Sequence, residues 1–224
     1  MRFICGKYIL ATFAVINAIA TASNAAIVGL YDFEGDSLTP SSVDSNLSFS
    51  NFSYTGPGTT NFFAGNPGDA YSSNNWAAGT IDLGRYFQFS IDPNPGFEVT
   101  LNSLELDERR SGTGPTTWEV RSSLDNYAST LSLFNVPDNT DFRANQTTNF
   151  SSTFTGLTNS VTFRIYGYNA ESGVGTWRLD NVEVDGIVNA TATAVPFEFS
   201  PGLGLLILGV WLTGFQLKNR QKTK

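Results

Sequence analysis

Histidine is absent from this chain of 224 residues, and cysteine occurs once, at position 5. Without imidazole the chain cannot build a histidine-based catalytic triad, a usual zinc site or a general base that titrates near neutral pH. Because Cys5 lies in a segment that we expect to be removed, the mature protein should hold neither a disulfide nor a thiolate nucleophile. Packing alone must therefore hold its core together.

Lysine is missing from the whole stretch between residues 26 and 195. That stretch holds seven arginines against nineteen acidic residues, a formal charge of −12. Schiff-base chemistry needs a lysine and phosphate contacts need a basic surface, so lysine-based catalysis and nucleic-acid binding are both excluded. An acidic surface favours solubility and the binding of cations.

The length of the chain leaves room for one domain of ordinary size and some processing segments. We expect a signal peptide over residues 1–25, a β-rich domain over 26–187, a Thr/Ala-rich linker over 188–195 and a sorting signal over 196–224.

The first segment has the features of an export signal. Arg2 and Lys7 precede an apolar run over residues 8–22, and small residues at Ser23 and Ala25 suit cleavage after Ala25 by signal peptidase. A membrane-anchored start is the alternative, but the apolar run is shorter than the roughly 20 residues that span a bilayer.

The last segment is apolar and then basic. Residues 202–215 are largely apolar, and four of the last seven residues are Lys or Arg. An apolar helix of this length is a marginal transmembrane span, and the basic residues mark its cytoplasmic end. We expect it to hold the exported chain transiently in the inner membrane until a protease cuts beside it, as in a GPI signal. A permanent single-span tail anchor is the alternative.

A short motif in front of this apolar segment resembles a known family of sorting signals. The motif consists of Pro196, Phe197, Glu198, Phe199, Ser200 and Pro201. With the apolar helix and the basic tail, it resembles the PFE variant of the PEP-CTERM signal, in which Phe197 interrupts the common Pro-Glu-Pro. The resemblance covers about the last 30 residues. It implies processing by an exosortase-like membrane protease and delivery to the cell surface or extracellular matrix.

Between the end segments the sequence is typical of an all-β protein, with apolar residues at every second position and many Gly, Ser, Thr and Asn residues. It predicts a two-sheet β-sandwich, a jelly roll of about eight to ten strands. The clearest strands are predicted over 27–33, 47–52, 86–91, 97–101, 118–120, 161–165 and 177–184.

Two of these strands change their alternation partway. In one, the apolar positions are odd up to Leu101 and even from Leu104; in the other, they are odd up to Leu179 and even from Val182. A β-bulge in each strand would keep both sets facing inward and would re-aim polar groups such as Asp180. Two separate strands that end at the shift are the alternative.

The first and last predicted strands, around residues 31–36 and 177–186, resemble those of secreted jelly-roll modules that include several carbohydrate-binding families. In such modules a structural calcium joins the two strands. The resemblance implies a calcium site made by Asp32, Glu34, Asp36 and Asp180. Calcium needs six to eight oxygen ligands, which these acids would supply in part. The alternative is that they simply face solvent.

A catalytic interpretation starts from Glu105 and Asp107, two carboxylates at alternate strand positions. They match the first two places of the Glu-x-Asp-x-x-Glu motif of a jelly-roll glycosidase family, but Arg110 stands where the acid/base belongs. Without that proton donor, departure of the leaving group is not assisted. We therefore expect no enzymatic activity, with Arg109 and Arg110 as a solvated strand end that pairs with local acids.

Binding of polysaccharide remains, because sugars stack on aromatic rings while Arg and Asn bond their hydroxyls. The candidate ligand-binding residues are Trp76, Arg121, Arg164, Tyr166 and Tyr168. The alternative for each aromatic is a place in the core, which aromatic residues dominate in sandwiches. The sequence thus favours a non-catalytic extracellular β-sandwich that binds polysaccharide, with a structural or adhesive matrix protein and an incomplete glycosidase as alternatives.

Overall fold

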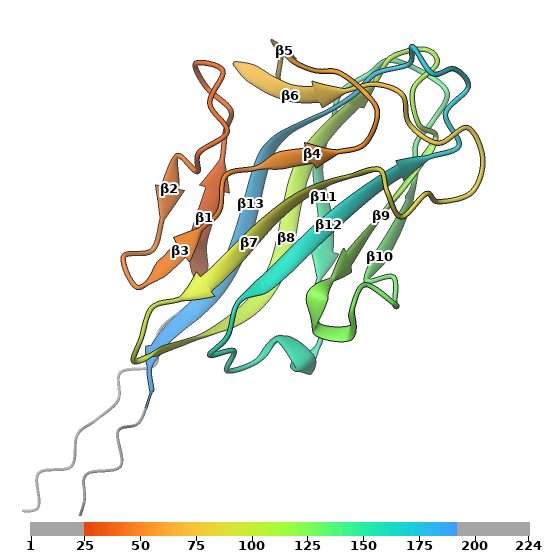
Figure 1. Cartoon of the computed structure of the whole chain (residues 1–224). Coiled ribbons are helices and arrows are strands. Elements are labelled where there is room, and N and C mark those ends of the chain that lie inside the picture. The colour runs from red at the N-terminus through yellow and green to blue at the C-terminus, as the bar shows by residue number, and fades with distance from the viewer. Residues whose placement is uncertain (1–24, 192–224) are drawn as a thin grey trace, which may run out of the picture. The chain divides into compact units, whose positions relative to one another are not determined.

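The computed structural model describes residues 25–191, which form thirteen strands and two short 3-10 helices, η1 (Ser123–Asp125) and η2 (Ser152–Phe154). The strands make two antiparallel sheets that face each other (Figure 1). The seven-stranded sheet contains β1 (Ala26–Tyr31), β2 (Ser42–Val43), β5 (Thr60–Ala64), β6 (Asp69–Ser73), β8 (Phe97–Arg110), β11 (Arg143–Asn149) and β13 (Trp177–Ala190). The six-stranded sheet contains β3 (Leu47–Phe49), β4 (Ser53–Thr55), β7 (Tyr86–Pro93), β9 (Thr117–Ser122), β10 (Ser132–Asn135) and β12 (Val161–Tyr168).

The prediction of an all-β sandwich is confirmed. Each clearly predicted strand has a counterpart, but the strands outnumber the prediction because short strands such as β2, β4 and β10 carry too few residues to show an alternating pattern. No helix among residues 25–191 is both long and apolar enough to cross a bilayer. Residues 1–24 of the predicted signal peptide, and the whole sorting signal, lie outside the described residues.

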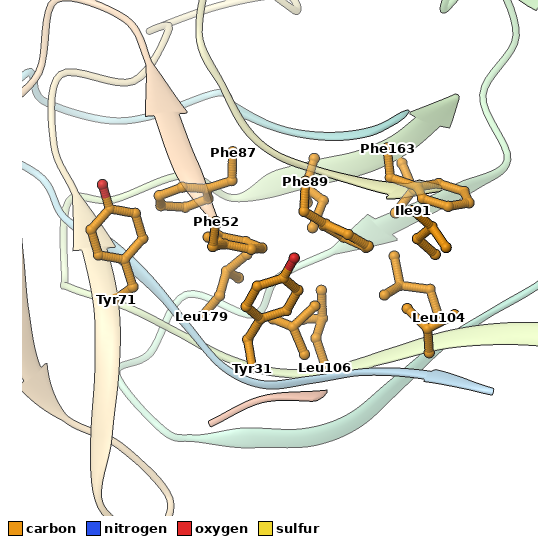
Figure 2. Packing of buried hydrophobic residues seen from close by; sticks show 14 of the residues in the cluster. Tyr31, Phe52, Tyr71, Phe87, Phe89, Ile91, Leu104, Leu106, Phe163 and Leu179 are labelled. Atoms are coloured by element: carbon orange, nitrogen blue, oxygen red, sulfur yellow. The ribbon is translucent and has the colours of Figure 1, made fainter. Parts of the chain in front are cut away.

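Aromatic side chains from both sheets fill the space between them. On β7 the alternate residues Phe87, Phe89 and Ile91 are fully buried, and they meet Leu106 and Leu179 from the other sheet (Figure 2). Full burial of a side chain such as Phe stabilises the folded state by about 1.5–3 kcal/mol. One or two such rings match the roughly 2–4 kcal/mol of a disulfide, so the fold does not need one.

Both changes of alternation are β-bulges. Strands β8 and β13 run unbroken beside each other, and their register shifts between Asp180 and Glu183 and again between Asp185 and Gly186. At the first shift Asn181 adopts a positive φ of 46°, as an inserted residue can. The bulge keeps Leu179 and Val182 both in the core, so the alternative of two separate strands is wrong.

The end of the domain lies beyond its predicted boundary. Strand β13 continues to Ala190, which pairs with Phe97, so the first three residues of the predicted linker belong to the sheet. The extension was not predicted because Asn189 and Ala190 are exposed at the end of the strand, where burial places little demand on residue type, although Val188 packs against the core. The start of β1 lies beside the far part of β13, with Ala26 opposite Gly186.

Candidate functional site

Four of the five predicted ligand-binding residues lie together on the outer face of the six-stranded sheet. On β12, Val161, Phe163 and Ile165 are fully buried in the core, so the residues between them point outward. Arg164 pairs across the sheet with Arg121 of β9. We call this surface the arginine–tyrosine face; its members are Tyr86, Glu119, Arg121, Tyr127, Arg164, Tyr166 and Tyr168.

Arg164 lies between two tyrosine rings. The Cζ atom of its guanidinium is 4.2 Å from the ring centroid of Tyr86 and 3.8 Å from that of Tyr127. Each contact is a cation–π interaction worth about 0.5–2 kcal/mol. Within residues 25–191 its Nε is buried without a hydrogen-bond partner, whereas Nη1 and Nη2 are not among the buried unpaired atoms. The two rings contact the guanidinium, and its terminal Nη1 and Nη2 atoms remain accessible to a ligand.

Tyr127 reaches this position from a strained turn after η1. Its φ is 62°, in the left-handed region that bulky residues rarely adopt. Its amide donates to the carbonyl of Ser122 at 2.9 Å, and its own carbonyl accepts from Nη1 of Arg121 at 2.9 Å. Strain of this kind costs about 1–3 kcal/mol and occurs preferentially at functional sites, so the turn is a second mark of a site.

Glu119 is the negative group of the face, and its charge is already compensated. Its carboxylate is ion-paired with Arg121 and accepts hydrogen bonds from the hydroxyls of Thr130 at 3.0 Å and Tyr168 at 3.2 Å. Burial, followed by the charge of Glu119, raises the pKa of Tyr168 and keeps its phenol a donor. This network leaves Arg164 as the uncompensated charge of the face.

Tyr166 lies on the predicted face but is fully buried beneath its neighbours. Its ring packs edge-on against Tyr86, with 5.4 Å between centroids, and its hydroxyl lacks a well-formed hydrogen bond among the described residues. Burial raises the pKa of this phenol, and a polar contact with the side chain of Arg164, followed by the positive charges of Arg164 and Arg121, opposes the rise. Tyr166 therefore supports the face rather than offering a ring for a sugar to stack on.

Trp76 was wrongly predicted as a sugar-stacking residue. It is 1% exposed, packs against Phe87 and Trp177, and donates its Nε1–H to the carbonyl of Ser73 at 2.9 Å. The Asn- and Ser-rich sequence around it suggested an exposed loop, yet that loop folds its tryptophan into the core. Here the alternative of a core aromatic is correct.

A row of polar side chains crosses the face from strand to strand. Ser53 of β4 pairs with Gln88 of β7, Gln88 with Arg164, and Arg164 with Arg121. Neighbouring strands lie about 4.8 Å apart, so the row spans about 14 Å. Sequence reasoning missed Gln88 and Tyr86, although their alternation with the buried residues of β7 already placed them on this face.

The predicted calcium ligands do not converge as a set. Asp32 accepts a hydrogen bond from the amide of Glu34 at 3.2 Å within its own turn, and Asp36 is exposed. Glu34 and Asp180 instead approach one loop between β5 and β6: a Cβ at Gly68 would overlap Oε1 of Glu34, and one at Gly65 would overlap Oδ2 of Asp180. No three His, Cys, Asp or Glu side chains within residues 25–191 are grouped to hold a metal.

Asp180 is nevertheless an unusual carboxylate. It is 1% exposed, it accepts a hydrogen bond from the Asn66 amide at 2.6 Å, and it forms no ion pair with any described residue. Burial, with the charges of Asp107 and Glu34, raises its pKa to about 6. The carboxylates of Asp180 and its acidic neighbours offer oxygen ligands with uncompensated negative charge, which is the chemistry that calcium prefers.

The residues of the glycosidase motif are also placed differently from the prediction. Arg110 is fully buried, not solvated, and it pairs with Asp138 at 3.0 Å and Glu171 at 2.8 Å. In this part of β8 the even-numbered residues face inward and the odd-numbered ones, such as Asp107, face outward, so the side chain of Arg110 points into the core. Asp107 points outward and accepts hydrogen bonds from the Asn145 amide at 2.8 Å and from the side chain of Asn181 at 3.1 Å.

No protein-family model and no curated protein match this chain. Among solved structures, the CBM22-1–CBM22-2 tandem of Xyn10C from Paenibacillus barcinonensis is 11% identical, with a TM-score of 0.46, over 80% of this chain and 50% of that one, so this chain spans half its length. The K3 adhesin domain of Lys-gingipain from Porphyromonas gingivalis is 15% identical over 72% and 99%, with a TM-score of 0.41. CBM27-1 of Caldicellulosiruptor saccharolyticus, solved with mannohexaose, is 13% identical over 72% and 97%, with a TM-score of 0.39. At such values these neighbours say nothing about the ligand of this chain.

Proposed function

We propose that this protein is a non-catalytic, extracellular polysaccharide-binding protein whose ligand lies on the arginine–tyrosine face. The observation that supports this most is the transverse row Ser53, Gln88, Arg164 and Arg121, which sets hydrogen-bonding side chains at a regular spacing on a rigid sheet. A linear polysaccharide also offers hydroxyls at a regular repeat. The flanking Tyr127 and Tyr168 are half-buried and add partly accessible aromatic surface.

Retention of the purified full chain in gels cast with single polysaccharides tests this proposal. Gln88→Leu keeps the size of the side chain and removes its hydrogen bonds, each worth about 0.5–1.5 kcal/mol, so we expect a two- to tenfold loss of affinity. Gln146→Leu makes the same change on β11 of the other sheet and should have no effect. Retention that is equal in both variants would place the ligand elsewhere; retention by no polysaccharide would favour a structural matrix protein.

We propose further that calcium binds between the first turn and the bulge of β13. Glu34 and Asp180 would be the carboxylate ligands, and the adjacent loop, whose Asn66 carbonyl is 3.3 Å from the side-chain amide of Asn181, would supply further oxygens. Such an ion would join the two ends of the domain and compensate the charge of Asp180. A rise of the thermal midpoint on adding calcium, absent in Asp180→Asn, tests the site.

Export and sorting are proposed from the end segments of the sequence. The chain would be cleaved by signal peptidase, held by its apolar helix and released or attached by an exosortase-like protease. Mass spectrometry of the protein from native cells gives the test: an unshortened chain that still ends at Lys224 would contradict the proposal.

A further inference from the structure

Arg164 differs from every other arginine between residues 25 and 191. Arg85, Arg110, Arg121 and Arg143 form ion pairs with carboxylates. Two more arginines donate to backbone carbonyls, Arg109 to Thr140 and Arg178 to Ala64. Within this part of the chain, Arg164 alone has neither an ion pair nor a hydrogen bond to a carboxylate or backbone carbonyl, and its polar neighbour is the phenol of Tyr166. A half-buried cation that has no anionic partner among the described residues suggests that an anion from outside the chain binds there.

The two tyrosine rings determine how such a partner approaches. Both rings contact the guanidinium at its Cζ atom, which leaves the N–H edge, with Nη1 and Nη2, as the part that a partner can reach. A planar fork of N–H donors matches a planar carboxylate through two parallel hydrogen bonds. With χ freedom removed by the rings, little side-chain entropy is lost when the ligand binds.

From this geometry we propose that the polysaccharide bound on the arginine–tyrosine face is acidic, and that Arg164 recognises the carboxylate of its uronic-acid residues. This inference rests on the proposed function and names the class of its ligand. Arg121 lies directly opposite Arg164 and adds positive potential, while Glu119, the nearest acid on the face, is compensated by Arg121, Thr130 and Tyr168.

The charge of the domain makes binding of a polyanion informative. Between residues 26 and 195 the formal charge is −12, so the field of the whole domain repels a polyuronate. A basic protein binds such polymers without specificity, but this domain cannot. Retention by a polyuronate therefore reports a local contact rather than general attraction.

The experiment measures the affinity of the full chain for polygalacturonate and alginate, for methyl-esterified polygalacturonate, in which the same sugars are neutral, and for a sulfated dextran. We expect binding to at least one polyuronate, and binding at least tenfold weaker to the esterified polymer. Arg164→Met should weaken polyuronate binding by about ten- to a hundredfold, as expected for losing a charged hydrogen-bonded pair. Arg164→Lys, which keeps the charge without the fork, should recover only part of it. Arg109→Met, on the outer face of the other sheet and likewise over an aromatic ring, is the matched control.

Tyr127→Asn provides a second variant in case Arg164→Met fails to fold. Asparagine tolerates the positive φ of this position and lacks the ring. Tyr127 positions Arg164, so in this variant the ratio of the affinity for polygalacturonate to the affinity for its methyl ester should fall about three- to tenfold. The thermal midpoint of the variant should stay within a few degrees of that of the parent protein.

The outcomes separate the two proposals. Equal affinity for the charged and esterified polymers, or for Arg164→Met and the parent, overturns the assignment of an acidic ligand. Preference for the sulfated dextran over both polyuronates overturns it as well. If neutral polymers bind and Gln88→Leu weakens them, the proposed function still holds; if no polymer binds, both proposals fail.

Discussion

The outer faces of the two sheets are built by the same alternation and carry opposite chemistry. On the six-stranded sheet, outward positions hold Arg121, Arg164 and three tyrosines around one compensated acid. On the seven-stranded sheet, Asp107 pairs with Asp180 and Glu105 with Glu183, with no ion pair to any described residue. Neighbouring acids contribute, after burial, to the raised pKa of Glu183. One face thus holds a guanidinium without an ion pair, and the other holds carboxylates without one, so the proposed polysaccharide and the proposed calcium ion are assigned to different sheets.

The largest effect on this comparison should come from the core that supports both faces. Trp177 is fully buried between the sheets, contacts Trp76 and Trp118, and donates its Nε1–H to Glu108 at 2.8 Å. Trp177→Ala should lower the free energy of unfolding by about 3–5 kcal/mol. Urea denaturation measures this loss of stability. Binding of polysaccharide and stabilisation by calcium should both be lost in the variant. Retention of either at full strength in a destabilised variant would show that the faces are supported separately.

Calcium should stabilise only through the acidic face. At about one hundred times its dissociation constant a ligand adds about 2.7 kcal/mol, which raises the thermal midpoint of a domain this size by roughly 5–10 °C. Asp180→Asn should abolish the rise, whereas Asp36→Asn, the same change at an exposed acid, should preserve it. A rise that survives in Asp180→Asn would move the ion to other ligands.

In a calcium chelator the acidic face should make stability depend on pH. The pKa of Asp180 is raised to about 6, above the value of about 3.9 in an unfolded chain, so folding favours its neutral form. The stability it contributes is complete below the unfolded pKa and is lost as the pH rises through about 6. The thermal midpoint should therefore increase between pH 7 and pH 5, and Asp180→Asn should flatten this increase. A midpoint that falls over this interval would contradict the assignment.

The smallest effect concerns the hydroxyl of Tyr166. Tyr166→Phe removes a buried hydroxyl that lacks a well-formed hydrogen bond among the described residues, and it should raise the free energy of unfolding by about 1 kcal/mol, seen as a higher urea midpoint at unchanged slope. Tyr31→Phe is the matched control, because that hydroxyl donates to the carbonyl of Ser50 at 2.6 Å and its loss should destabilise. Destabilisation in both variants would mean that Tyr166 is hydrogen-bonded.

Prediction from the sequence succeeded where the alternation of apolar and polar residues within one strand is enough to decide which side chains are buried. The strands around Phe87, Phe163 and Leu179, and both bulges, follow from apolar spacing, because a core face must stay buried along a strand. The prediction failed where burial depends on residues far along the chain. Trp76 lies in a polar loop and Arg110 ends a charged run, yet both are buried by segments more than twenty residues away.

By itself the sequence determined an acidic, disulfide-free sandwich of alternating strands, and it singled out Arg121, Arg164, Tyr166 and Tyr168 as candidate ligand-binding residues. Only the tertiary structure decided that Arg164 lies between Tyr86 and Tyr127 and that Glu119 is already compensated. The physical reason is that alternation sets which way a side chain points, whereas cross-strand register and the turn after η1 set what it meets there. The proposed recognition of a polysaccharide depends on those contacts.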